Sequence, residues 1–470
     1  MTVTAGVRCN CGASRVASGV RHGQRNRARP SALTHQRSPW RAVLGMPNPT
    51  IIRRLLAAGL AGLLMSACAA ATPPPQRQAG SDLALDEPRT HGPRGDGVQK
   101  PPSARLWPDA SARFHSEPEW LGADSAYSIA VDPQHVLWLF ADTFLDPARD
   151  GTRTNGPNVF IRNSAAIQSG DTPEQAHDLS RSRIDFYWGP ANKAGSPSSF
   201  FHDADGSEHW IWPLHGACLP SGQLLIFRMH VVKDSSPFGF RVDGWDAVAI
   251  DDPLLPPDQW QPRQIRGPQR PSSKLVGSSV LLHGAHLYAY AVDETSVDHA
   301  IYLVRWPLAQ LVGLASGALD DPAWWTGHDF VRESALSAST PAVAVFGAGQ
   351  VELSVHYEAD HQRFVEVQMT GLFASDPHTQ LSLRTAQEPW GPWSAPVGFF
   401  RPVEAELENA ADLIAYAGKA HPEQRGPGGH GVLTYVVNDL KHFPPADRVY
   451  YPQLVQMYYA PSPAPAVPGE

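Results

Sequence analysis

Hydrophobic positions along the chain fall into short runs of strand length that alternate with polar turns. Five runs that end in a polar residue share this pattern: LWLFADT (137–143), LLIFRMH (224–230), LYAYAVD (287–293), LSVHYEAD (353–360) and LTYVVND (433–439). A second apolar stretch precedes most of these runs across an Asp-Pro, Ser-Gly or His-Gly turn, and a third strand candidate follows most of them. Such a unit cannot bury both of its faces alone, so five copies predict blades stacked around an axis.

We therefore predict an all-β fold, a five-bladed β-propeller over residues 105–460. Each unit spans about 70 residues, more than the roughly 40–50 of a compact blade, so we expect long inter-blade loops. Convincing amphipathic helical patterns are missing, which weakens an α/β interpretation. One short loop helix is expected near PLAQLVGLA (307–315). A two-domain β-sandwich protein is the alternative.

The N-terminal residues differ from the rest of the chain. Residues 1–45 hold eight Arg and no Asp or Glu, and Met46 offers an alternative start. Residues 46–67 combine Arg53 and Arg54 with a short apolar run before Cys68, which predicts a secretory signal of the bacterial lipoprotein kind with lipidation at Cys68. An ordinary cleaved signal peptide is the alternative. Residues 68–104 are Pro-rich and predict a disordered tether, and residues 461–470 predict a disordered tail.

Charge and cysteine content narrow the choice of partner. Cleavage before Cys68 leaves 28 basic and 46 acidic residues, a formal charge of 28 − 46 = −18. Such a body repels nucleic acid and anionic membrane surfaces, so we expect membrane contact only through the lipid. In the body Cys218 is the sole cysteine, which excludes a disulfide framework or a zinc pattern, and we expect it to be a buried core thiol.

Two aspartates bracket the segment DSAYSIAVDPQHVLWLFADT (124–143). Asp124 and Asp142 are equidistant from Pro133, so an antiparallel hairpin turning there places them opposite each other, with Cα atoms about 4.5–5.5 Å apart. Arg162 and Asn163 begin the next strand at the same end. Two nearby carboxylates tend to separate their pKa values into a proton donor and a base or nucleophile, as glycoside hydrolysis requires. The alternative is that each aspartate merely caps a turn.

Other polar and aromatic residues are secondary candidates. We place Asp293, Glu358 and Asn438 on the same rim as the two aspartates, because each ends a repeat. His215 and His356 lie within or beside inner runs, where a hydrogen-bonded core histidine is the alternative to a ligand. Five tryptophans could stack on sugar faces, of which we expect one or two to do so: Trp188, Trp210, Trp212, Trp324 and Trp325.

Several motifs carry a resemblance to a known group. The segments are GADSAYSIAVDPQHVLWLFADTFL (122–145), IRNSAAIQ (161–168), EPWGPWSAP (388–396) and AYAGKAHPEQ (415–424), followed by GVLTYVVND. They resemble five-bladed propellers of the glycosidase and sialidase-like kind, nearest to domain-of-unknown-function family 4185, some members of which are endo-acting D-arabinan hydrolases. The resemblance implies that two acids at the channel mouth do the chemistry, and Asp124 and Asp142 match those positions.

The roles implied are Asp142 as base or nucleophile and Asp124 as its acid partner or pKa modulator, or the reverse. A separate general acid has no motif here, and Glu404, Glu406 and Glu408 are candidates. The expected substrate-binding residues are Arg162, Asn163, His215, His356, Asn438 and His421. His421 falls near the turn end of its blade, which favours a structural role. We expect no cofactor, with a channel-bound calcium as the one that the resemblance allows.

The sequence thus predicts a glycoside hydrolase-like propeller, lipid-anchored in the bacterial cell envelope and facing the periplasm or exterior. Its substrate would be a polysaccharide or oligosaccharide, for example a furanoside. A non-catalytic glycan-binding or envelope scaffold lipoprotein is the alternative, and a propeller surface for a protein partner is a third.

Overall fold

The computed structural model describes residues 101–458 except 154–158, 193–194, 203–207, 236–238, 268–273, 296–298 and 315–316. The predicted leader, signal peptide, lipidation site at Cys68, most of the tether and the tail lie outside the described residues. Helices in the described part are short, namely α3 (Pro108–Ser111), α4 (Pro173–Ala176) and single 3₁₀ turns that include Leu308–Gln310 and Val312–Leu314. None of them has the length and apolar character that a membrane span requires.

Five antiparallel sheets form the blades, which confirms the predicted five-bladed propeller. The first has β3 (Tyr127–Asp132), β4 (His135–Phe140), β7 (Ser164–Ser169) and β8 (Arg183–Tyr187), and the second β9 (His209–Cys218), β10 (Leu224–Lys233), β11 (Phe240–Ile250) and β12 (Arg263–Ile265). The third has β13 (Lys274–His283), β14 (His286–Asp293), β15 (Ile301–Pro307), β16 (Ala323–Trp325) and β17 (Phe330–Arg332). The fourth has β18 (Leu353–Glu358), β19 (Arg363–Thr370), β20 (Gln380–Ala386) and β21 (Val397–Phe400). The fifth has β22 (Leu413–Ala420), β23 (Gly431–Asp439), β24 (Gln453–Tyr458) and β1 (Ser103–Leu106).

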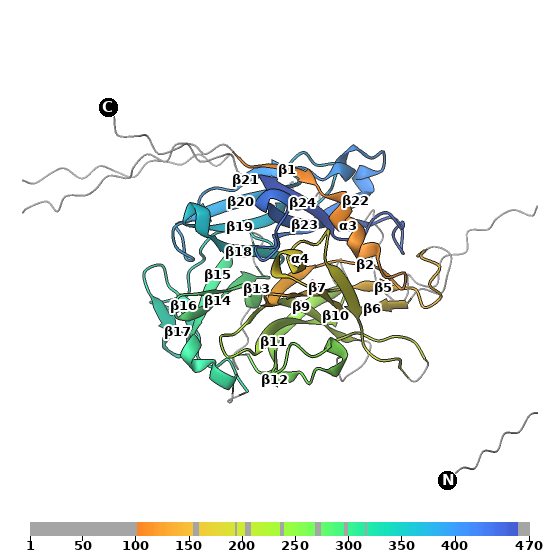
Figure 1. Cartoon of the computed structure of the whole chain (residues 1–470). Coiled ribbons are helices and arrows are strands. Elements are labelled where there is room, and N and C mark those ends of the chain that lie inside the picture. The colour runs from red at the N-terminus through yellow and green to blue at the C-terminus, as the bar shows by residue number, and fades with distance from the viewer. Residues whose placement is uncertain are drawn as a thin grey trace, which may run out of the picture. The chain divides into compact units, whose positions relative to one another are not determined.

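The ring is closed by the most N-terminal strand. β1 pairs antiparallel with β24, from Ser103 opposite Tyr458 to Leu106 opposite Val455, so the fifth blade joins both ends of the described chain (Figure 1). The innermost strands β3, β9, β13, β18 and β22 contact one another in that order around the axis. β1 begins two residues before the predicted start of the propeller, inside the predicted tether.

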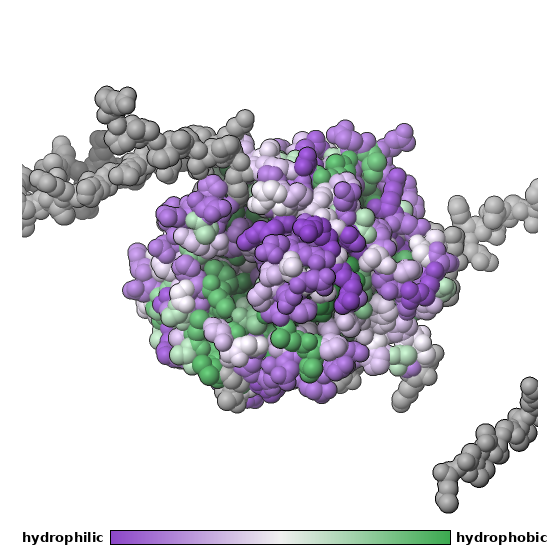
Figure 2. Space-filling view, viewed as in Figure 1, coloured by the Kyte–Doolittle hydropathy of each residue, from purple (hydrophilic) through white to green (hydrophobic). Residues whose placement is uncertain are grey.

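Apolar side chains fill the spaces between blades. Both faces of the central strands are buried, as in β14, where Leu287 to Val292 are all buried. The surface in Figure 2 is mainly hydrophilic, with hydrophobic residues gathered in recesses. This division follows from stacking, because each blade covers the face of the next.

The hairpin of the first blade has the predicted register. Tyr127 pairs with Leu139 and Ser128 with Trp138, a reflection through Pro133. Pairing resumes in a small sheet of β2 (Trp120–Ala123), β5 (Thr143–Leu145) and β6 (Val159–Ile161), where Ala123 lies opposite Thr143 on the same reflection. Asp124 and Asp142 therefore lie opposite each other in the gap between two paired segments. Ser125 and Ala126 cross that gap with φ values of 71° and 57°, in the left-handed region.

Two sequence interpretations are wrong. LSVHYEAD contains β18, which is the innermost strand of the fourth blade rather than its second, and RFVEVQM lies in the second strand, β19. Innermost strands run away from the end that carries Asp124, so Glu358 lies at the opposite end of the channel and not on the predicted rim. Cys218 is partly exposed at the end of β9 instead of buried in the core.

Candidate functional site

Asp142 follows β4 and is held by a cation and an indole. Arg162, just after β6, places Nη1 at 3.3 and 3.4 Å from the two carboxylate oxygens, and Trp212 Nε1 on β9 donates to Oδ1 at 2.9 Å. The Arg162 guanidinium also lies 4.2 Å from the centre of a Trp210 ring. Burial raises the pKa of Asp142, while Arg162 and the indole act against that shift.

Asp124, just before β3, has a different environment. Its Oδ2 accepts hydrogen bonds from the hydroxyls of Tyr416 at 2.7 Å and Tyr450 at 3.0 Å, and its shielded Oδ1 has no partner among the described residues. Burial, the Asp142 charge and the charge of Glu352 raise the pKa of Asp124 well above its ordinary value, against the two tyrosine hydroxyls. Asp124 therefore keeps its proton more firmly than Asp142, which has a cation beside it.

A third carboxylate joins the site from the fourth blade. Glu352 directly precedes β18, its side chain is 20% exposed, and its Oε1 lies 3.1 Å from Lys419 Nζ. Lys419, on β22, is almost fully buried and also donates to the backbone oxygens of Ser125 and Ala417. Its ammonium lies 4.4 Å from the centre of the Tyr127 ring.

Lys419 thus joins three segments that each carry a site residue. Ser125 follows Asp124, Ala417 follows Tyr416, and Glu352 is itself a site carboxylate. Ser125 and Ala417 both have left-handed backbones, which cost free energy for residues other than glycine. The ammonium stabilises both segments by donating hydrogen bonds to their carbonyl oxygens.

The predicted binding residues are not all at this site. Arg162 is, and Asn438 lies at the same end of the fifth blade, because it pairs with Ile414 near the start of β22. Asn163 is fully buried, and its amide bonds to the backbone of Phe201 and Ile211. Asn163 therefore shapes the loop before β9 and has no exposed surface for a sugar.

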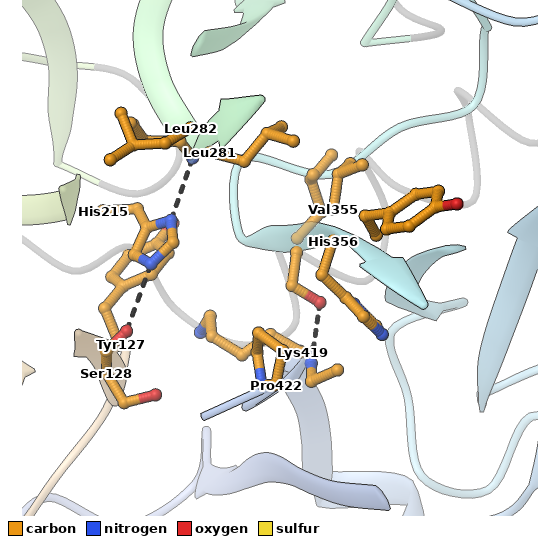
Figure 3. Close-up of a pocket in the computed structure, with 14 residues that line it drawn as sticks. Tyr127, Ser128, His215, Leu281, Leu282, Val355, His356, Lys419 and Pro422 are labelled. Carbon is orange, nitrogen blue, oxygen red and sulfur yellow. Dashed lines mark hydrogen bonds between the residues drawn. The ribbon is translucent and has the colours of Figure 1, made fainter. Parts of the chain in front are cut away.

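The histidines lie deeper along the channel. His215 and His356 line a cavity of about 260 Å³ between the innermost strands, with Tyr127 and Lys419 also in its wall (Figure 3). His215 Nδ1 accepts from the Val280 amide at 2.9 Å and Nε2 faces the Ser128 carbonyl at 3.1 Å. Burial lowers the pKa of His215 and of His356 to about 4, so both rings are neutral.

His421, predicted as a binding residue, is instead a buried link between the fifth and first blades, 1% exposed and bonded through both ring nitrogens. Its Nδ1 lies 2.5 Å from Ser128 Oγ and its Nε2 lies 2.7 Å from Thr434 Oγ1. Ser128 also bonds to Glu423, so the His-Pro-Glu element fastens β22 to β3. Glu404, a sequence candidate for the general acid, instead accepts a hydrogen bond from Tyr435 at 2.8 Å.

Sequence reasoning missed Glu352, Lys419, Tyr416, Tyr450 and the indole contact of Trp212. The AYAGKAHPE motif contained Tyr416 and Lys419, and the available signal was that it places polar residues on an otherwise apolar strand. In the described ranges no group of three or more His, Cys, Asp or Glu side chains is arranged to hold a metal ion. The mouth carboxylates Asp142 and Glu352 are already paired with Arg162 and Lys419, so we derive no step through a metal.

Comparison with known proteins adds the family and supports the fold. A crystal structure of a putative hydrolase from Bacteroides ovatus superposes with a TM-score of 0.57 at 14% identity, over 75% of this chain and 90% of that one. An alpha-L-arabinofuranosidase from Lactobacillus brevis (TM-score 0.38, 14% identity, 74% and 93% coverage) and an endo-arabinase from Bacteroides thetaiotaomicron (0.38, 12%, 75% and 97%) are more distant. At these identities the likeness concerns the fold alone.

No curated protein matches the sequence. The family model that does match is not the one for family 4185, to which the motifs were compared above. It is the model described as "Domain of unknown function (DUF5005)", and it matches residues 111–443. Since the match extends over most of the chain, the protein belongs to the DUF5005 family.

Proposed function

We propose that the protein is a glycoside hydrolase that cleaves a polysaccharide or oligosaccharide at the channel mouth. The observation that carries this proposal is the meeting of Asp124 and Asp142 with Glu352 from a second blade, where Arg162 and the Trp212 indole contact Asp142 and two tyrosine hydroxyls contact Asp124. Hydrolysis adds water across a glycosidic C–O bond, with hydroxide going to the anomeric carbon and a proton to the leaving oxygen. It needs a carboxylate and a carboxylic acid that flank the bond to be cut.

The environments suggest a role for each acid. Asp142 is the base or nucleophile, since Arg162 and the Trp212 indole favour its ionised form. Asp124 is the protonated partner that tunes Asp142, because its Oδ2 is bound by two hydroxyls and its Oδ1 is shielded. Glu352 reaches the site from the fourth blade, and its charge acts on Asp124, so it is the proton donor we favour over Glu404, Glu406 and Glu408. The furanoside specificity expected from the resemblance to family 4185 is part of this proposal.

A second function has one observation in its favour. Asp142 is paired with Arg162 and Asp124 is capped by tyrosines, which also suits a glycan-binding or scaffold protein in which the acids only hold the loops. Binding without turnover would then be the protein's activity.

Activity screening on furanose and pyranose polysaccharides separates the two. We expect wild-type turnover to be lost in Asp124→Asn, Asp142→Asn and Glu352→Gln and retained in Asp360→Asn, an exposed acid beyond the far end of β18. An aryl glycoside with a good leaving group should restore activity to Glu352→Gln only, because it needs no proton. Glycan binding that is equal in all variants, with no turnover in any, would favour the binding protein.

The envelope location is a separate part of the proposal, supported only by the sequence of residues 46–68. Expression of the full chain in a bacterium should place it in the membrane fraction. Cys68→Ala should move it to the soluble fraction, and an unchanged distribution would contradict lipid anchoring.

A further inference from the structure

An aromatic surface adjoins the carboxylates on the side of the small sheet. Phe144 on β5, Phe160 on β6 and Phe443 in the loop after β23 pack together, with ring centres 5.0 Å (144–160), 5.4 Å (144–443) and 5.6 Å (160–443) apart. Phe144 is buried, Phe160 is partly exposed, and Phe443 is 41% exposed. The three rings therefore form a supported layer whose outer member is open to solvent.

This layer is continuous with the catalytic groups. Phe160 lies two residues before Arg162, and since side chains alternate along a strand both lie on one side of the sheet. The Arg162 guanidinium is 5.1 Å from the centre of the Phe160 ring while its Nη1 lies 3.3 Å from Asp142. On the other flank, the Tyr450 ring packs edge-on against Phe144 at 5.4 Å and its hydroxyl bonds to Asp124.

The loop that carries Phe443 is held in place. The Asp439 carboxylate accepts hydrogen bonds from the amides of Lys441 at 2.8 Å and His442 at 3.2 Å, and it lies 2.9 Å from His442 Nδ1. Such an Asx turn fixes the backbone one residue before Phe443. The exposed ring therefore has a defined position, and little conformational entropy is lost when a ligand packs on it.

We propose that Phe443 and Phe160 form a subsite for a neutral sugar unit next to the bond that is cut, so that the substrate is a chain longer than a disaccharide. This inference rests on the proposed function. Sugar rings present C–H faces that pack on flat aromatic surfaces, and their hydroxyls remain in water at the exposed edge. The excess of acidic residues in the body argues against an anionic polymer.

The test compares Phe443→Ala, Phe443→Tyr and wild type on arabino- and xylo-oligosaccharides from disaccharide to hexasaccharide and on an aryl monoglycoside. Tyr357→Ala is the matched control, since Tyr357 is 42% exposed at the opposite end of the channel. We expect Phe443→Ala to lower kcat/KM about three- to tenfold on the longer chains, to leave the aryl monoglycoside within about twofold, and Phe443→Tyr to retain activity. Thermal unfolding of each variant checks that the fold is intact.

Each outcome bears on the subsite. Equal losses for Phe443→Ala at every chain length, or no loss at any, would overturn it while leaving hydrolysis intact. If wild type turns over none of these substrates, binding of the hexasaccharide by titration calorimetry replaces the rates. If only Phe443→Ala then binds the hexasaccharide more weakly, the subsite stands and hydrolysis of these sugars is rejected. If Phe443→Ala binds as wild type does, or if no protein binds, the subsite is rejected.

Discussion

Replacing Lys419 with Met removes the ammonium that joins three segments of the site, while keeping a side chain of similar length and volume. The change leaves the Glu352 carboxylate and the carbonyl oxygens of Ser125 and Ala417 without their donor. Removing one partner of a buried ion pair costs about 3–5 kcal/mol. Since Glu352 keeps 20% of its side chain in water, we expect the lower end, about 3 kcal/mol.

This loss can be converted into a melting temperature. A folded body of roughly 350 residues has an unfolding entropy of about 0.7 kcal/mol/K, so a loss of about 3 kcal/mol lowers Tm by about 4 °C. Lys233→Met is the matched control, because Lys233 and Glu208 form a pair at a similar distance, 3.2 Å, but with 37% and 61% of the side chains exposed. An exposed pair contributes about 0–1 kcal/mol, so this control should shift Tm by about 1 °C or less.

Differential scanning calorimetry gives both shifts, and amide hydrogen exchange tests whether the effect is local. The amides of Ala126 and Ala141 both donate to the Asp124 carbonyl, and their exchange should accelerate in Lys419→Met more than exchange in β14, far from the site. If Lys419→Met melts within about 1 °C of wild type, as the control does, the ammonium does not hold the site together.

Three further predictions concern individual contacts. Gly122 has φ +106°, and an added Cβ would lie 2.2 Å from the Tyr450 carbonyl oxygen. Gly122→Ala should therefore destabilise the protein by at least about 2 kcal/mol more than Gly222→Ala, where φ is +87° and the space is open. Equal losses in the two variants would mean that backbone strain alone matters. Burial raises the pKa of Glu366 to about 8, above its unfolded value, so the folded state holds an extra proton between about pH 4.5 and 8. The unfolding free energy should therefore fall as pH rises through this range, at up to about 1.4 kcal/mol per pH unit. Glu366→Gln should remove that slope in urea titrations, and an unchanged slope would refute the assignment to Glu366. Tyr450→Phe removes a hydrogen-bond donor to Asp124 and should raise the pKa of that carboxyl. The limb of the pH–activity profile that Asp124 governs should then move to higher pH. If neither limb moves, Asp124 does not govern the profile.

The sequence could predict what is encoded over short distances. The position of Asp124 opposite Asp142 follows from one hairpin with an Asp-Pro turn, and that hairpin has the expected register over Tyr127–Ala130. The failure in the fourth blade has a physical cause. The turn between β18 and β19 contains neither Gly nor Pro and uses Gln362 in the left-handed region, at φ 50°.

Because the turn between β18 and β19 has no sequence signal, Glu352 was not predicted as a site residue. Without that signal, LSVHYE has the same apolar character as a second strand, and Glu352 falls on the wrong end of the blade. Tyr416 and Tyr450 could not be assigned for another reason, since they are 292 and 326 residues from Asp124 and no local pattern links them to it. Asn163 shows the opposite error, a binding residue predicted where there is none. It lies at the correct end of its strand, but its side chain forms hydrogen bonds to the backbone instead of facing a ligand.

The site lies where the ring closes, and this couples the geometry of Asp124 to the completion of the fold. Tyr416 and Lys419 lie on β22 of the last blade, while Asp124 and Ser125 precede the first strand of the first blade. β1 completes the fifth blade from the N-terminal side, and the Ser128–His421 contact joins the same two blades deeper in the channel. An open ring would leave Asp124 without its two hydroxyls and exposed to water, which removes the burial that raises its pKa. The raised pKa of Asp124 is therefore a property of the closed propeller and not of the hairpin that carries the two aspartates.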